Sequence, residues 1–203
     1  MKTSYKYLML VAAFGLTACQ QESGNEQPEE QNVVVEKKVE TKKEEKKAVK
    51  QVQPVDEHSY GNIDEVQLHH LDLELTVNFD AKALEGFVDL TFKRLKDDVS
   101  ELVLDTRDIT IDKTQQWVND SWQDTSFDLA DKDPDLGSKL SIQINDSTQK
   151  VRVYYKTQPQ ASGLQWLTPE QTAGKKHPFV YSQAQAIHAR SFIPLQDSPA
   201  VRV

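Results

Sequence analysis

Two glutamines near the end of the chain, Gln183 and Gln185, have the residue type and spacing to hold the free end of a peptide. If residues 179–189 form a strand, the two side chains project from the same face, about 7 Å apart. Each amide offers a carbonyl acceptor and two N–H donors, which suits a peptide backbone or an amine. Ala184, on the other face, leaves room for close packing. A polar strand face exposed to solvent is the alternative interpretation of the same pattern.

A regular alternation of apolar and polar residues predicts the sheet that must position this segment. Every second residue is apolar over residues 71–79, and the same period returns at Val88, Leu90 and Phe92 after a connection at residues 80–85. This pattern predicts a hairpin of half-buried strands. Shorter runs of the same kind lie at residues 101–104, 109–111, 140–144 and 151–155. Because no long segment has a helical period, we predict an all-β fold, an antiparallel sandwich or saddle-shaped sheet.

Two local signals add detail to this scaffold. Gly86, just before the second strand of the hairpin, suits a bulge or close packing against a neighbour. Thr168 can cap a helical turn in which Pro169 takes the first position and Gln171 completes a capping box. Gly174 would end this turn, which is the only convincing helical signal.

Composition excludes several classes of function. The chain has 203 residues and a formal net charge of -8, so it offers no basic face for nucleic acid. Its one cysteine, Cys19, can form no intramolecular disulfide and no zinc site made of several thiolates. The globular remainder is roughly 140 residues long, a common size for one domain.

The first 18 residues have the pattern of a secretory signal. Lys2 and Lys6 precede a short apolar run at residues 8–16, and small residues follow. The segment at residues 16–19 also resembles the lipobox of bacterial lipoproteins, in which the cysteine is acylated and becomes the mature N-terminus. The resemblance implies a lipidated Cys19 that anchors the chain in a membrane. Because Gln20 is not aspartate, we expect the outer membrane of a bacterial envelope, on the periplasmic side.

Residues 19–57 are predicted to be a disordered tether. Glutamate and lysine dominate them, and such a composition buries too little apolar surface to offset the entropy of ordering. Charge pairs four residues apart, such as those that follow Glu40 and Glu44, would support at most a partly helical spacer. The domain itself is then predicted to span residues 58–203.

A resemblance to a known family gives the glutamines a more specific role. The segments that carry it are residues 163–167, 176–179, 182–190 and 194–199. They resemble the N-terminal domain of leukotriene A4 hydrolase-like proteins, which are M1 zinc aminopeptidases. The resemblance is dense over residues 161–203, fainter back to about Tyr60, and does not include the signal or the tether. It implies a saddle of antiparallel strands that packs on a zinc-containing catalytic domain.

The same resemblance implies that Gln183, Ala184 and Gln185 form the segment that contacts the substrate. Gln185 would accept a hydrogen bond from the terminal ammonium of a peptide, and Gln183 would position the neighbouring backbone. Since both are amides, acidic residues of the catalytic domain would have to supply negative charge. His188 and Arg190 match family positions, and we expect structural roles for them.

The sequence departs from the family where catalysis takes place. The Gly-x-Met-Glu-Asn and His-Glu-x-x-His motifs are absent from it. Zinc activation of water needs three protein ligands and a nearby base, so we expect no metal site in this chain and no activity from it alone. The leading hypothesis is the N-terminal fragment of a lipid-anchored aminopeptidase whose catalytic domain is missing. The alternative is a free-standing lipoprotein module with the same fold that binds peptides without cleaving them.

Overall fold

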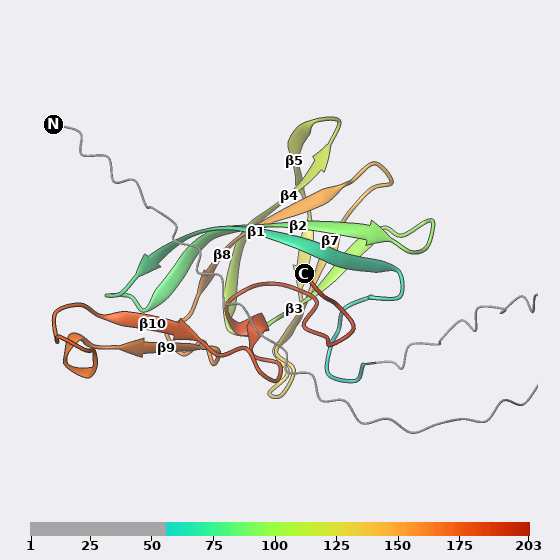
Figure 1. Ribbon diagram of the computed structural model, residues 1–203. Coiled ribbons are helices and arrows are strands. Elements are labelled where there is room, and N and C mark those ends of the chain that lie inside the picture. The colour runs from blue at the N-terminus through green and yellow to red at the C-terminus, as the bar shows by residue number, and fades with distance from the viewer. Residues whose placement is uncertain (1–55) are drawn as a thin grey trace, which may run out of the picture. The chain divides into compact units, whose positions relative to one another are not determined.

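The computed structural model describes residues 56–203, whose regular structure is antiparallel β-sheet with two single-turn 3₁₀ helices (Figure 1). The predicted all-β class is therefore confirmed. The signal, Cys19 and nearly all of the predicted tether lie outside the described residues. Within residues 56–203, no helix is long and apolar enough to cross a membrane.

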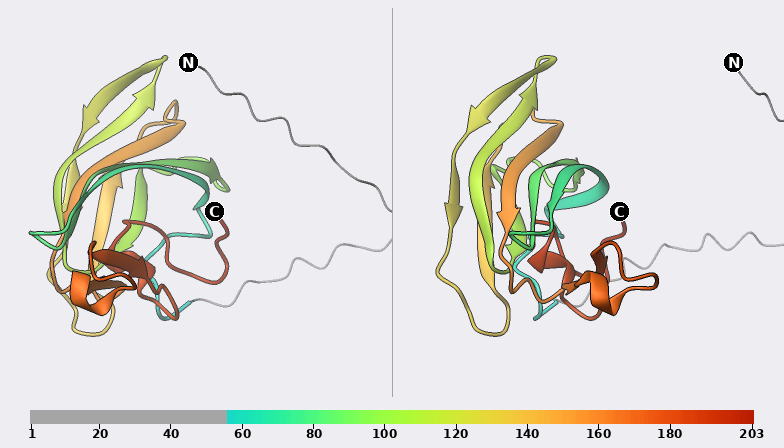
Figure 2. Two further views of the ribbon diagram at one scale, coloured as in Figure 1. Left: turned by 60° about the vertical axis from the view of Figure 1, so that its left-hand side comes forward. Right: turned by 90° about the vertical axis from the view of Figure 1, so that its left-hand side faces the viewer.

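In the described residues 56–203, ten strands form two larger sheets and one separate hairpin. The five-stranded sheet has the order β1-β2-β8-β4-β5, the three-stranded sheet β3-β7-β6, and the hairpin pairs β9 with β10. The strands of the five-stranded sheet are β1 Val66–Asn78, β2 Ala83–Arg94, β8 Lys150–Thr157, β4 Ile109–Val118 and β5 Ser121–Thr125. The others are β3 Glu101–Thr106, β7 Ser138–Gln143, β6 Phe127–Leu129, β9 Leu164–Leu167 and β10 Phe179–Ser182. Figure 2 shows that the five-stranded sheet is strongly curved.

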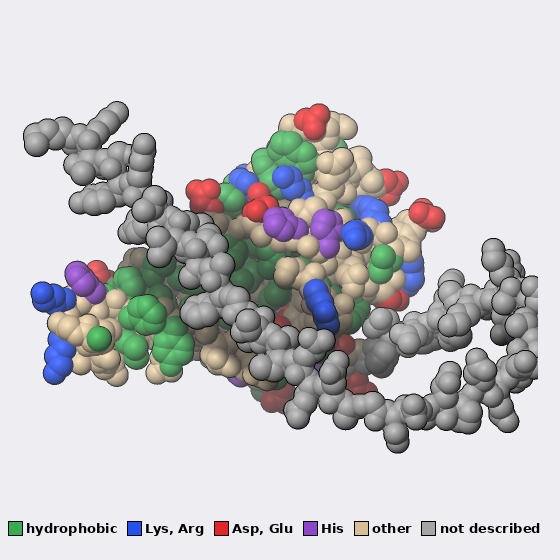
Figure 3. Space-filling view, viewed as in Figure 1, with side chains coloured by type: hydrophobic (Ala, Val, Ile, Leu, Met, Phe, Trp, Pro, Cys, Tyr) green, Lys and Arg blue, Asp and Glu red, His purple; other side chains and the backbone are tan. Residues whose placement is uncertain are grey.

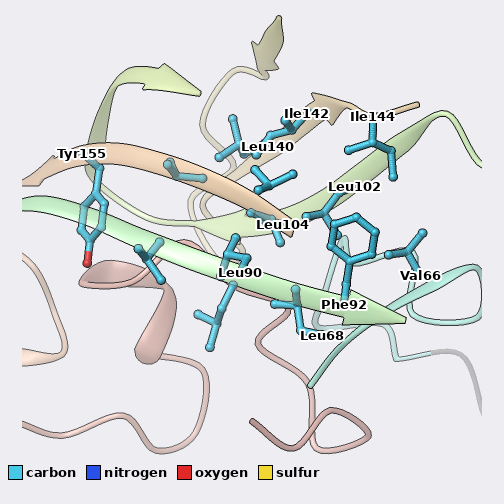
Figure 4. Close-up of a cluster of buried hydrophobic side chains, with 14 of the residues drawn as sticks. Val66, Leu68, Leu90, Phe92, Leu102, Leu104, Leu140, Ile142, Ile144 and Tyr155 are labelled. Carbon is cyan, nitrogen blue, oxygen red and sulfur yellow. The ribbon is translucent and has the colours of Figure 1, made fainter. Parts of the chain in front are cut away.

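The hydrophobic core lies between the two larger sheets. In β8 every second residue is buried, because successive side chains of a strand point to opposite faces. Figure 4 shows leucine, isoleucine and aromatic side chains from both sheets meeting in this layer. The buried cluster includes Val66, Leu68, Leu90, Phe92, Leu102, Leu104, Leu140, Ile142, Val153 and Tyr155. The predicted strands at residues 101–104, 109–111, 140–144 and 151–155 all contribute to it.

The hairpin of β1 and β2 is confirmed, with two changes. β1 begins at Val66, earlier than predicted, because a bulge after Leu68 shifts the alternation before Leu71. Gly86 lies opposite Leu75 in regular pairing, so it does not form a bulge. A Cβ atom there would overlap the carbonyl oxygen of Glu74, which shows that close packing is the reason for the glycine.

The predicted helical turn is also present, as a single 3₁₀ turn, η1 Pro169–Gln171. The side chain of Gln171 accepts a hydrogen bond from the Thr168 backbone N–H at 2.9 Å, the expected half of the capping box. The turn closes at Thr172, earlier than Gly174. It lies in the connection between β9 and β10, in the hairpin that directly precedes Gln183 and Gln185.

Candidate functional site

The predicted strand through both glutamines is wrong, because β10 ends at Ser182. The last bond of the ladder runs from the Gln183 N–H to the Gly163 carbonyl at 2.8 Å, where the partner strand β9 has just begun. The chain then turns, and the His188 N–H donates to the Ala184 carbonyl at 2.8 Å. We call residues 183–188 the glutamine loop. The two amides therefore do not project from one face of a strand.

The glutamine loop presents its side chains to solvent. Gln183, Ala184 and Gln185 are all exposed, whereas burial increases from Ile187 onward. Neither glutamine points into the interior of its own domain, so both amides are available to a ligand. This exposure is compatible with both interpretations of the sequence, a ligand-binding pair of amides and a polar surface.

An apolar groove lies beside the loop, between the β1–β2 hairpin and the β9–β10 hairpin. It has a volume of about 240 Å³. Its wall includes Leu73, Leu75, Leu84, Leu164, Val180, Tyr181, Ser182, Phe192 and Ile193. Tyr181 and Ser182 immediately precede the glutamine loop, so the groove and the loop are continuous.

Large apolar side chains extend from this groove onto the open surface. Leu73 is 48% exposed and Phe179 is 53% exposed, and Val77, Phe79 and Tyr181 are also exposed. Figure 3 shows hydrophobic side chains gathered between the left-hand end of the sheet and the β9–β10 hairpin. We call these five residues the apolar face. A contiguous patch of this kind is typical of an interaction surface.

An aromatic contact holds the β9–β10 hairpin against the β1–β2 hairpin. The rings of Phe79 and Trp166 meet edge to face, with their centroids 5.6 Å apart. Such pairs add to the stabilisation from buried area alone. The hairpin that leads into the glutamine loop is thereby fixed to the main sheet.

The far end of the loop is fixed by Arg190, which is fully buried. It lies in the second 3₁₀ turn, η2 Ala189–Ser191. Its Nη2 donates to the His58 carbonyl at 2.7 Å, its Nη1 to the Leu136 carbonyl at 2.9 Å, and its Nε to Asp197 at 3.1 Å. The guanidinium thus joins three segments that are distant in sequence. The structural role expected for Arg190 is confirmed.

Asp105 completes this buried cluster, 3.6 Å from Arg190. Its carboxylate accepts hydrogen bonds from the Ser59 hydroxyl at 2.6 Å and from the Tyr60 and Asp197 backbone N–H groups at 2.7 and 2.8 Å. Burial nevertheless raises the pKa of Asp105. Sequence reasoning missed this residue, although an acidic side chain directly after the buried run 102–104 is a usable signal.

Metal ligands are not assembled in the described part of the chain. Within residues 56–203, no three histidine, cysteine, aspartate or glutamate side chains come close enough to hold a metal ion. A catalytic zinc needs three protein ligands, so these residues do not fit one.

Comparison with known sequences decides the family. Residues 67–203 match the peptidase M1 N-terminal domain. The chain belongs to the M1 peptidase family. The matched residues include both larger sheets, apart from Val66 at the start of β1, and also the apolar groove and the glutamine loop.

Individual M1 relatives agree with this assignment. The chain is 38% identical over 152 residues to leukotriene A-4 hydrolase of Xenopus laevis, and 38% identical over 153 residues to leucine aminopeptidase 2 of Pyricularia oryzae. Each match covers 72% of this chain and 24% of the relative. The structure of native yeast LTA4 hydrolase superposes with a TM-score of 0.67 at 31% identity, over 75% of this chain and 24% of that one. The chain therefore spans about a quarter of the length of these relatives.

Proposed function

We propose that this chain is the N-terminal domain of a zinc aminopeptidase and that its glutamine loop contacts the N-terminus of a peptide substrate. The observation that carries the proposal is the exposure of Gln183 and Gln185 beside an apolar groove, in a domain of the M1 family. The names of the relatives, a leukotriene A-4 hydrolase and a leucine aminopeptidase, support an enzyme of this kind.

In this proposal the two amides have different partners. The Gln185 carbonyl oxygen accepts a hydrogen bond from the substrate ammonium, and Gln183 binds the adjacent backbone. Both contacts are made by neutral groups, so the domain orients the peptide terminus without neutralising its charge. The acidic residues, the zinc ion that activates water and its ligands all belong to the catalytic domain.

The apolar face provides the surface on which that catalytic domain docks. The chain spans 24% of the length of its relatives, so in such a protein the remaining part is large enough to cover Leu73 and Phe179. Full burial of such a side chain contributes roughly 1.5–3 kcal/mol, and because these two are about half exposed, covering them contributes about half of that each. Because the glutamine loop adjoins the groove, docking on this face places Gln183 and Gln185 next to the partner domain.

The Gln185→Ala variant tests this function in a protein that joins the chain to its catalytic domain. A hydrogen bond to a charged group contributes about 1.5–3 kcal/mol, so kcat/KM for an unblocked peptide should fall about 10- to 100-fold. Gln123→Ala is the matched control, because Gln123 is an exposed glutamine on the edge strand β5. If Gln185→Ala keeps the kcat/KM of the control, the loop does not bind the substrate terminus.

The lipid anchor is a separate part of the proposal, supported by the signal and lipobox pattern before Cys19. Expressed in a bacterium with two membranes, the chain should sediment with the outer-membrane fraction of the cells. Cys19→Ser should release it into the soluble fraction, because a chain without lipid lacks an anchor. Gln20→Asp supplies the residue expected to retain lipoproteins at the inner membrane and should move the protein there. Sedimentation of Cys19→Ser with the membranes would exclude lipidation as the anchor.

A further inference from the structure

Gly163 lies at a point of backbone contact that tolerates no side chain. A Cβ atom there would be 2.5 Å from the His188 carbonyl oxygen and 2.8 Å from the Phe192 ring. Gly163 is buried, and two chain segments that are 25 residues apart in sequence pass each other at this position. Space alone therefore requires glycine here.

Both backbone polar groups of Gly163 are bonded to the ends of the glutamine loop. Its carbonyl accepts from the Gln183 N–H at 2.8 Å, at the start of the loop. Its N–H donates to the Ser191 hydroxyl at 2.8 Å, and that hydroxyl donates to the His188 carbonyl at 2.7 Å, at the end of the loop. The neighbouring Ser162 hydroxyl bonds His188 Nδ1 at 2.8 Å. One residue thus closes the loop from both sides.

The residues on both sides of this closure are held by other contacts. Ser191 is fully buried, and Arg190 beside it is held by the cluster with Asp197. On the other side β10 is paired with β9 along its whole length. The exposed residues 183–186 lie between these two supports and make no contribution to the buried core.

We propose that Gly163 and Ser191 are positioning residues that set where the Gln183 and Gln185 amides meet the substrate. The inference rests on the proposed function of these glutamines. A hydrogen bond to a substrate terminus requires placement within a fraction of an ångström, and a closed loop provides it. Neither Gly163 nor Ser191 has to touch the substrate.

The test is a double-mutant cycle in the protein that carries the catalytic domain. Gly163→Ala should lower kcat/KM for an unblocked peptide about tenfold or more, since a displacement of about 1 Å can cost a hundredfold. If Gly163 acts through the two amides, adding Gly163→Ala to the Gln183→Ala/Gln185→Ala variant should cause no further loss of kcat/KM. Losses that multiply would show a general structural effect and overturn the inference. No loss in Gln185→Ala itself would instead overturn the proposed function.

Two further variants keep the result interpretable. Gly174→Ala adds a methyl group that meets no other atom, and the strain from its positive φ stays in the exposed turn of the same hairpin, so kcat/KM should fall far less than in Gly163→Ala. Ser191→Ala removes both hydroxyl bonds without adding volume. If Gly163→Ala fails to fold, Ser191→Ala should show the expected loss of kcat/KM in its place. In the 203-residue chain, Ser191→Ala should speed amide hydrogen exchange at Gln183 and His188 about tenfold or more and leave Val153 unchanged. Equal protection of Gln183 and His188 in both proteins would contradict the closure of the loop.

Discussion

Replacing Arg190 by methionine is expected to remove about 3–5 kcal/mol from the free energy of unfolding, because it leaves buried charges without their partner. Asp105 and Asp197 both lose the guanidinium, and the carbonyls of His58 and Leu136 lose their donors. Methionine fills a similar volume, so the loss of stability measures the effect of the missing charge and not that of a cavity. Urea denaturation followed by tryptophan fluorescence measures it.

An exposed ion pair is the control for this prediction. Lys96 bridges Asp64 and Glu65 at the surface, where solvent weakens the interaction, so Lys96→Met should change the midpoint little. A second variant, Arg190→Met combined with Asp105→Asn and Asp197→Asn, removes the uncompensated charges. It should recover part of the lost stability, and failure to recover any would show that packing around Arg190, not charge, is responsible.

Leu90→Ala is expected to cost about 2–5 kcal/mol of unfolding free energy, because it opens a cavity in the layer between the two larger sheets. Leu90 is fully buried in β2 and belongs to the main hydrophobic cluster. Thermal or urea unfolding of the 203-residue chain measures the change.

Leu73→Ala makes the same chemical change on the neighbouring strand β1, where the side chain is 48% exposed. It should cost much less in this chain, since little area is withdrawn from water. When the catalytic domain is present, Leu73→Ala should become clearly destabilising, because docking would bury that side chain. An equal cost with and without the catalytic domain would exclude the apolar face as the docking surface.

Periodicity was sufficient to predict the scaffold. Strict alternation identified β1, β2 and β8 because each has one face on the core and one toward solvent. The bulge after Leu68 was not predictable, since no distinctive local pattern marks the point where the alternation of apolar and polar residues changes phase. The partner order β1-β2-β8-β4-β5 depends on pairings between residues far apart in the chain, which no local signal encodes.

For the candidate site, the geometry predicted from the sequence is wrong, while the roles of its residues stay a prediction. Gln183 and Gln185 were identified, yet the alternation that continues past Ser182 led to a strand where the structure has a turn. β10 loses its partner after Ser182 because β9 begins only at Leu164, a tertiary constraint that residues 179–189 do not contain. Gly163 was noted only as part of a family resemblance, because its importance lies in the distant His188 carbonyl.

Arg190 also determines how this domain can be attached to others. The same guanidinium nitrogen binds the carbonyls of His58 and Asp197, so the segments before the first strand and after the last strand are held side by side. A module with adjacent attachment points can sit between an anchor and a further body without separating them. Mechanical tension between residues 58 and 197 would act directly on this side chain, because both carbonyls are bonded to the same nitrogen.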